Sequence, residues 1–213
     1  NDRVSQLPSF FPSNNHENLL ICITGIGAGS EFSALMANKL PNLHFLSTSQ
    51  CFPLYQYKFS EKKEGLIPGL LNNRESKKSA ISDAALNIFQ DKYKDESISK
   101  EDIFFYIYAV FHSKEYLEKY KNNLKKELPR IPVAEIFDNF KIFVKSGRLL
   151  SDLHVNYENI EKYPIQIKQG DLRLTPIEDP KNHFRVEKMK FIKKDKKKFF
   201  YNSHITIENI PLD

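Results

Sequence analysis

The sequence has no tryptophan, and its 213 residues include only two cysteines, two methionines and seven glycines. Cys22 and Cys51 lie in apolar sequence without the paired spacing of zinc ligands. Neither a disulfide-stabilised scaffold nor a zinc site is therefore expected, and a reducing cytoplasm is the compartment that fits.

Long apolar runs are also missing. The longest, residues 19–23 and 103–111, fall well short of the roughly 20 residues that cross a bilayer, so we expect no membrane span. The first residues have neither the basic start nor the apolar stretch of a secretory signal, and there is no initial Met. We expect the chain to be a segment of a longer polypeptide.

Large apolar side chains are plentiful. Hydrophobic residues make up 40% of the chain, with 17 Phe and 10 Tyr, against 28% charged residues. This composition can build a core and is too apolar for a disordered chain. The length predicts one large domain or two small ones.

The net charge of +5 is concentrated near the C-terminus. Residues 161–213 contain 12 basic and 8 acidic residues, and residues 181–198 contain nine basic and two acidic ones. A local basic segment on a balanced body favours a polyanion-binding element.

The first 60 residues read mostly as β structure. Residues 18–24 form a short β-branched run that predicts a buried strand, and residues 51–59 predict another. Strands are also expected at 32–36 and 43–46, although a helix over 31–40 is an alternative. Residues 60–79 are polar and predict an exposed connection, which is the one plausible internal boundary.

The middle reads as about four helices. One is expected over residues 81–93. Ser99 and Asp102 have capping-box spacing before a second, and Ser113 can cap a third that Pro129 ends. A fourth is expected from about residue 134, with continuation through Gly147 to Leu153 left open.

The last segment returns to strands. Residues 166–174 are a weak strand candidate, and residues 184–192 and 199–207 read as the two arms of a hairpin with a lysine-rich tip at 193–198. The expected fold class is α+β: residues 1–60 β, 80–160 helical and 161–213 a β hairpin, in a single region covering 1–213.

No catalytic centre assembles from the sequence. Residues 25–29 (GIGAG) follow an apolar run, but the third glycine of a dinucleotide fingerprint is missing, so a glycine-rich turn is favoured over a phosphate loop. The six histidines have no partner at metal-ligand spacing, so no metal site is expected. Ser113 beside His112 is better explained as a helix cap than as a nucleophile.

The basic hairpin has two open explanations. A two-stranded ribbon fits the DNA major groove, and clustered lysines release counterions from phosphates. Lysines also protect sheet edges and solvate hairpin tips. Composition alone does not separate the two.

Several strings resemble the C-terminal specificity region of type ISP restriction-modification enzymes, in that family's order and over nearly the whole chain. They are residues 18–25 (NLLICITG), 50–55 (QCFPLY), 102–116 (DIFFYIYAVFHSKEY), 128–132 (LPRIP), 153–158 (LHVNYE) and 186–191 (VEKMKF) with Tyr201-Asn202 and Ile210-Pro211.

The resemblance implies a DNA target-recognition fragment of a bacterial enzyme whose parent chain is an adenine-N6 DNA methyltransferase and ATP-dependent endonuclease. It implies double-stranded DNA and the parent's methyltransferase and motor domains as partners. S-adenosylmethionine, ATP and Mg are expected only in the parent. The fragment lacks the methyltransferase motifs, so catalysis by it alone is not expected.

Physical chemistry then suggests roles for individual residues. Lysines would contact phosphates, and side chains with forked donors or amides suit base edges, while Arg130 follows a rigid helix exit and is a further phosphate candidate. The expected phosphate contacts are Lys188, Lys190, Lys193, Lys194, Lys196, Lys197 and Lys198. The expected base readers are Arg185, Arg173, Gln166 and Asn202.

Two rival functions stay open. In one, the helices dock on neighbouring domains and the lysines only solubilise the chain. In the other, a free-standing enzyme uses the glycine loop. The recognised DNA sequence does not follow from residue identities, because readout depends on geometry and DNA shape.

Overall fold

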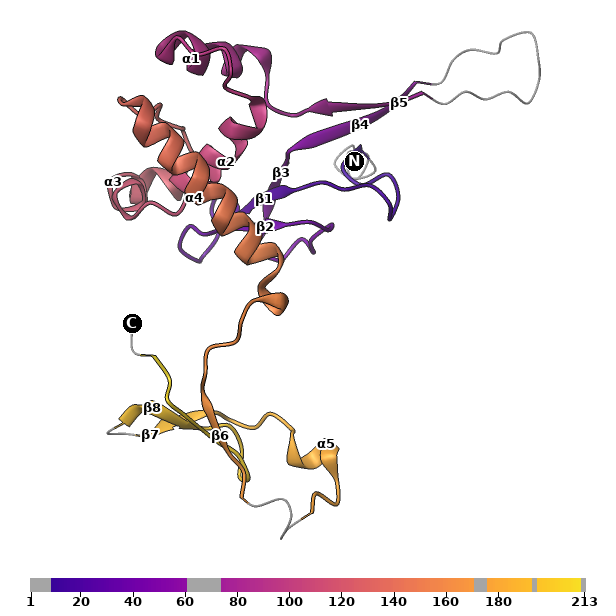
Figure 1. The fold of residues 1–213 in the computed structure, drawn as a ribbon, viewed down its shortest axis with the longest axis vertical. Coiled ribbons are helices and arrows are strands. Elements are labelled where there is room, and N and C mark those ends of the chain that lie inside the picture. Colours follow the sequence, from indigo (N-terminus) through magenta and orange to yellow (C-terminus); the bar gives the residue numbers. More distant parts are fainter. Residues whose placement is uncertain (1–8, 61–73, 171–175, 193–194, 212–213) are drawn as a thin grey trace, which may run out of the picture. The chain divides into compact units, whose positions relative to one another are not determined.

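The computed structural model describes residues 9–60, 74–170, 176–192 and 195–211. It divides into two compact units, Asn1–Asn159 and Ile160–Asp213 (Figure 1). The chain thus divides after residue 159 and not within residues 60–79. No helix in the described ranges is long and apolar enough to cross a membrane. The fold is α+β, with strands in the N- and C-terminal parts and helices between them, as expected.

The first unit begins with a three-stranded antiparallel sheet of order β2-β1-β3. The central strand β1 (Leu20–Ile23) is buried along its whole length, which explains its continuous apolar sequence. β2 (Ala34–Ala37) alternates buried and half-buried positions, so the strand prediction is confirmed and the competing helix is wrong. The strand expected at 43–46 is also wrong, because these residues form turns.

The strand predicted at residues 51–59 is two strands, β3 (Gln50–Pro53) and β4 (Tyr55–Ser60), with a bend at Leu54. The buried Asn18 holds this bend, since its Nδ2 donates to the Tyr55 carbonyl at 2.7 Å and its Oδ1 accepts from the Tyr55 N–H at 3.0 Å. β4 pairs with β5 (Arg74–Ser79) in a separate two-stranded sheet. The final part of the expected connection is therefore a strand.

Four helices follow, and serines cap the first three. Ser82 caps α1 (Asp83–Tyr93), Ser99 caps α2 (Lys100–Val110) and Ser113 caps α3 (Lys114–Leu124). At α2 both halves of the predicted capping box are present. α4 (Phe137–Val155) continues through Gly147, and the short 3-10 helix η2 (Tyr157–Asn159) follows it.

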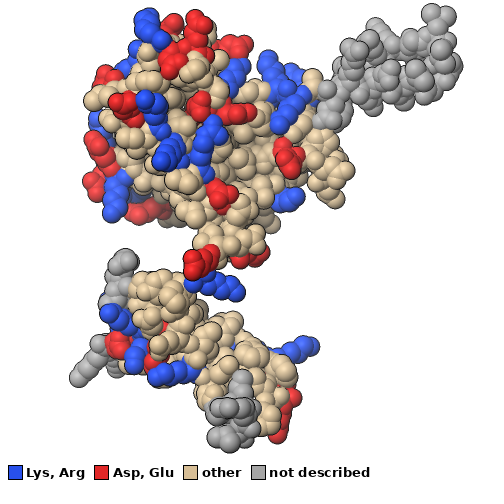
Figure 2. All heavy atoms as spheres, viewed as in Figure 1, with Lys and Arg blue, Asp and Glu red and all other residues tan. Residues whose placement is uncertain are grey.

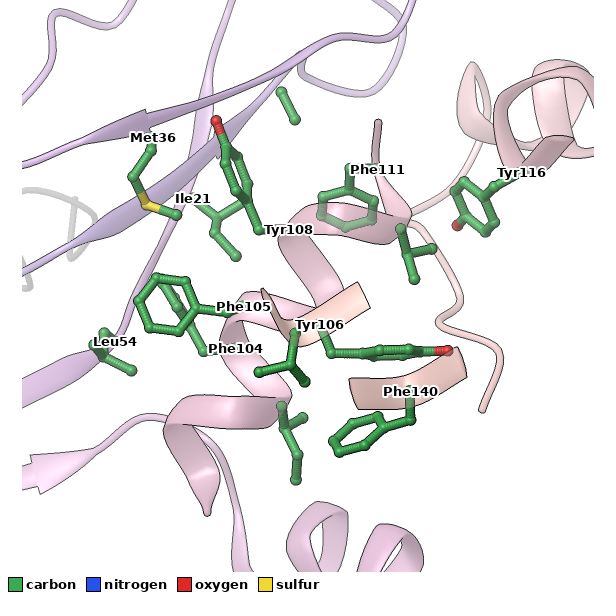
Figure 3. Close-up of a cluster of buried hydrophobic side chains, with 14 of the residues drawn as sticks. Ile21, Met36, Leu54, Phe104, Phe105, Tyr106, Tyr108, Phe111, Tyr116 and Phe140 are labelled. Atoms are coloured by element: carbon green, nitrogen blue, oxygen red, sulfur yellow. The ribbon is translucent and has the colours of Figure 1, made fainter. Parts of the chain in front are cut away.

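The core of the first unit forms around α2, which is buried on almost every side. Phe104 and Tyr108 are 2% and 0% exposed, and Tyr106 packs on Phe140 of α4 with ring centroids 5.1 Å apart (Figure 3). α2 and α4 approach closely at Gly147, where a Cβ would lie 2.0 Å from the Phe105 carbonyl oxygen. Glycine is required there because the helices leave no space for a side chain.

The two cysteines face each other across β1 and β3 as free thiols, with their sulfur atoms 3.4 Å apart. The neighbouring Cys51 sulfur and burial raise the pKa of the Cys22 thiol.

The second unit is a four-stranded antiparallel sheet of order β6-β9-β8-β7, with a short helix between its first two strands in sequence. The elements are β6 (Gln166–Lys168), α5 (Pro180–His183), β7 (Lys190–Ile192), β8 (Asp195–Phe200) and β9 (Thr206–Glu208).

Two details of the predicted hairpin are wrong. The residues at 184–189 are not a strand, and β8 begins at Asp195, so part of the expected lysine tip belongs to a strand. Phe191 pairs with Phe199, and the register then shifts through an irregularity, so that Ile192 pairs with Asp195. Apolar cross-strand packing therefore outweighs the tendency of lysines to occupy a turn.

Candidate nucleic-acid interface

The two units differ in charge. The first contains 20 Lys and Arg against 19 Asp and Glu, whereas the second contains 12 against 8. On the visible face of the first unit, basic and acidic side chains are interspersed (Figure 2). Because the first unit is nearly neutral and the second is basic, the second unit is the better candidate for a polyanion-binding site.

Strand register divides the side chains of the four-stranded sheet between two faces. Lys168, Thr206, Phe200 and Lys190 lie opposite one another in a row across β6, β9, β8 and β7. Because residues two apart on a strand share a face, this row shares its side of the sheet with other polar residues. We call this side the polar face; its members are Gln166, Lys168, Lys190, Lys198, Phe200, Thr206 and Glu208. Lys196 is exposed beside this face, where the pairing of β7 with β8 shifts register.

The three lysines of the polar face lie on three different strands, and two of them pair with one carboxylate. Glu208 lies on β9 between two of them, with Oε2 2.8 Å from Lys168 Nζ and Oε1 3.3 Å from Lys198 Nζ. Hydrogen bonding from these lysines, Lys168 first, lowers the pKa of Glu208. Lys190 and Lys196 are exposed, and Lys198 is half-buried. A face of this kind can place several ammonium groups against a row of phosphates.

The opposite side, the apolar face, has a different chemistry. Its cross-strand row is Ile167, Ile207, Phe199 and Phe191, and the two phenylalanine rings meet edge to face at 5.7 Å. Lys196 and Lys197 are exposed on β8, where its pairing with β7 shifts register between Phe191 and Ile192.

Arg185 and Lys188 are exposed on the segment that follows α5. The Asp179 side chain caps α5 by accepting from the Lys181 N–H at 3.0 Å. Asn202 then holds the chain beyond α5, since its Nδ2 donates to the carbonyls of His183 at 2.7 Å and Arg185 at 3.1 Å. This side-chain anchoring replaces the predicted strand.

Asn202 was expected to read bases, but its amide is engaged inside the protein. It is 6% exposed, and its Oδ1 accepts from the N–H groups of His204 at 2.8 Å and Ile205 at 2.7 Å, in addition to the two bonds donated by Nδ2. All four hydrogen-bonding positions of the amide are filled. Asn202 therefore holds a turn and has no free group for a base edge.

Arg130 belongs to the first unit. Its side chain is 87% exposed and forms an ion pair with Glu127 at 3.1 Å. The Tyr116 hydroxyl donates to the Arg130 carbonyl at 3.0 Å and the Tyr106 hydroxyl to the Pro132 carbonyl at 2.7 Å. A third tyrosine, Tyr93, donates to the Ala134 carbonyl at 2.6 Å. The segment is thus anchored through alternate carbonyls, in accord with the rigid helix exit expected there.

Arg173, Lys193 and Lys194 lie outside the described residues. Within the described ranges, the structure brings together Gln166, Lys190 and Lys198 on the polar face, with Lys196 exposed beside it. Sequence reasoning missed Lys168 and Glu208, which complete this face. Lys168 belongs to an expected strand, but the expected partner of residues 199–207 was 184–192, so the pairing of β6 with β9 was not anticipated.

The glycine-rich loop at 25–29 leads into strand β2 and not into a helix. Gly27 has φ +75 and donates to the Lys125 carbonyl at 3.3 Å, at the end of α3. At Gly25 a Cβ would lie 2.1 Å from the Thr48 carbonyl oxygen. The glycines thus permit a tight turn and close backbone approach, as the favoured interpretation predicted. No group of three metal-ligating side chains occurs in the described ranges.

The solved structures similar to the chain include three whose matches each cover 97% of it. They are a cryo-EM structure of a DrdV–DNA complex (32% identity, TM-score 0.76), the ATP-dependent type ISP restriction-modification enzyme LlaBIII bound to DNA (31%, 0.73) and a nuclease-deletion mutant of the type ISP enzyme LlaGI with a DNA substrate mimic (31%, 0.65). The chain spans 19%, 12% and 16% of these proteins, respectively. No curated protein is significantly similar to it.

With its two units, the chain thus has the fold of a domain of restriction-modification enzymes. The family model of the type ISP C-terminal specificity domain matches residues 1–213, and the chain belongs to that family. The resemblance inferred from the sequence motifs is confirmed.

Proposed function

We propose that this chain is the DNA target-recognition part of a bacterial restriction-modification enzyme, and that the polar face of its second unit contacts the DNA backbone. The observation that carries the proposal is the gathering of Lys168, Lys190 and Lys198 on one face of one sheet, with Lys196 exposed beside them. The DNA-bound state of the related structures supports double-stranded DNA as the ligand.

The proposed contacts divide by chemistry. The four lysines bind phosphates and set the register on the duplex, while Gln166, on the same face, offers an amide to base edges. Arg185 and Lys188 are exposed nearby in sequence and extend the contact set. Arg130 is an additional phosphate contact from the first unit. The lysines at 193 and 194 and Arg173 stay predictions from the sequence.

The parent polypeptide supplies the chemistry in this proposal. Adenine-N6 methylation with S-adenosylmethionine, and ATP- and Mg-dependent translocation and cleavage, belong to its other domains. The present chain contributes recognition without catalysis, in the bacterial cytoplasm.

The test is fluorescence anisotropy of the chain with random duplex DNA over a salt series. Changing Lys168, Lys190, Lys196 and Lys198 to Gln should weaken binding at low salt. The dependence of log K on log salt should flatten by about 0.9 for each phosphate that the protein no longer neutralises. The matched control changes four lysines on or beside α3, which removes the same charge from the first unit: Lys119, Lys121, Lys125 and Lys126.

Equal decreases in affinity in both variants would show a general charge effect and would contradict a defined phosphate-binding face. Absence of binding by folded wild-type protein would contradict the proposal itself.

A second candidate function is docking on neighbouring domains of the parent chain. Ile142, Leu149 and Leu153 are 59%, 58% and 46% exposed at seven- and four-residue spacing along one side of α4. An exposed apolar stripe of this kind is typical of helix pairing. Co-purification with the separately expressed remainder of the parent should be abolished in a Leu149→Lys variant and kept in an exposed control on α4, Lys145→Gln.

A further inference from the structure

Glu208 lies on the polar face at the end of β9. Its carboxylate lies on the second of four strands and pairs with one lysine on each neighbouring strand, Lys168 on β6 and Lys198 on β8. The side chain of Glu208 is only 15% exposed, whereas that of Lys168 is 63% exposed and that of Lys198 38%. The carboxylate is therefore held in place beneath ammonium groups that reach solvent.

This arrangement reduces the attraction of the face for polyanions. Each of the two lysines already has an anionic partner, and a phosphate approaching either of them must compete with the Glu208 carboxylate. Lys198 has a second acidic neighbour, since its Nζ lies 4.0 Å from Asp195 Oδ2. Two of the three lysines on this face are thus partly neutralised, whereas no ion pair involving Lys190, or Lys196 beside the face, occurs among the described residues.

A lower affinity for DNA of arbitrary sequence is useful to a recognition domain. The useful quantity for a protein that finds a short site is the ratio of specific to non-specific affinity, and non-specific affinity comes almost entirely from phosphate contacts. A fixed carboxylate on the phosphate-facing side lowers binding to every sequence, because it repels the backbone wherever the duplex lies.

We propose that Glu208 limits the affinity of the polar face for DNA of arbitrary sequence, by holding Lys168 and Lys198 in ion pairs and placing a negative charge among the phosphate-binding lysines. This inference rests on the proposed function, because it assigns a role within the same DNA-contacting face.

The experiment measures binding of the whole chain to random duplex DNA by anisotropy over a salt series, comparing wild type with Glu208→Gln. The amide has nearly the same shape and lacks the charge. We expect binding to tighten by about threefold to tenfold at about 50 mM salt and the salt slope to steepen by about 1–2, as two lysines become free for phosphates.

Glu161→Gln is the matched control, because it removes the same charge from an exposed position of the same unit outside the sheet. It should change the affinity less than about twofold, since an exposed charge without a lysine partner in the sheet is screened by salt. A triple variant, Glu208→Gln with Lys168→Gln and Lys198→Gln, should show no gain in affinity. Matching thermal unfolding curves establish that each variant is folded.

Unchanged or weaker binding by folded Glu208→Gln overturns the inference if the wild type binds DNA and responds to the polar-face lysine substitutions. An equal gain in Glu161→Gln also overturns it, since the effect would then be one of net charge. If no variant binds DNA, the proposed function itself fails.

Discussion

Replacing Gly147 by Ala should destabilise the first unit, although the same change stabilises most helices. In an exposed helix interior, Gly→Ala is favourable by about 1 kcal/mol. At Gly147 the added Cβ would lie 2.0 Å from the Phe105 carbonyl oxygen, and ordinary contacts begin at 3.4 Å, so α2 and α4 must separate by about 1.4 Å. Overpacking of this kind costs about 1–3 kcal/mol and at times more. Because the Cβ would meet a backbone atom and not a flexible side chain, the cost lies at or above about 3 kcal/mol. Subtracting the gain of about 1 kcal/mol leaves a net destabilisation of about 2 kcal/mol.

The assay is thermal and urea unfolding followed by circular dichroism at 222 nm, which reports the first unit because the four long helices belong to it. For a unit of this size, about 2 kcal/mol corresponds to a decrease in Tm of about 4–8 °C. Ser146→Ala is the matched control, since Ser146 is the exposed neighbour on the same helix and the change should be neutral or slightly stabilising.

A Gly147→Ala variant that is as stable as wild type, or more stable, would refute the reasoning. It would mean that α2 and α4 can separate without weakening their packing. A decrease of equal size in Ser146→Ala would refute it as well, because the effect would then not depend on the close approach.

Three further predictions concern single side chains. Tyr106→Phe leaves the Pro132 carbonyl without its hydroxyl donor and should lower the free energy of unfolding by about 1–3 kcal/mol, measured by urea titration. Burial, with a smaller contribution from His154, lowers the pKa of His112 to about 4, whereas the unfolded chain takes up this proton near pH 6.5. Stability should thus fall as pH drops from about 6.5 to about 4, and His112→Gln should flatten that part of a Tm–pH profile. Asn202→Ala breaks four internal hydrogen bonds and should increase amide hydrogen exchange around residues 183–185 and 204–205, with the α2 amides as an unchanged internal reference.

Local chemistry made the helical middle predictable. Ser82, Ser99 and Ser113 each accept a first-turn N–H as a cap residue, and Pro129 lies beyond the end of α3. These signals act within a few residues, so the sequence contains all that is needed to recognise them. The start of α4 was less predictable, because tyrosines from elsewhere in the chain hold residues 130–134 outside the helix.

The candidate site was only partly predictable, because it depends on pairing between strands and not on signals within a few residues. Which lysines share a face depends on strand register, and the register of β8 depends on Phe199 pairing with Phe191 and Ile207. A one-residue shift would move Lys198 off the polar face and away from Glu208. The pairing of β6 with β9 joins residues about 40 positions apart, and no local pattern indicates it.

The second unit contains little hydrophobic core: in the described ranges from residue 160 onward, Ile205, 5% exposed, is the one buried hydrophobic side chain. Burial of so little apolar surface stabilises the folded unit only slightly more than the loss of chain entropy destabilises it. A ligand that binds only the folded form adds about 2.7 kcal/mol when present at about 100 times its Kd. Folding of this unit and occupation of its surface are therefore thermodynamically linked, and its melting temperature can serve as a direct readout of ligand concentration.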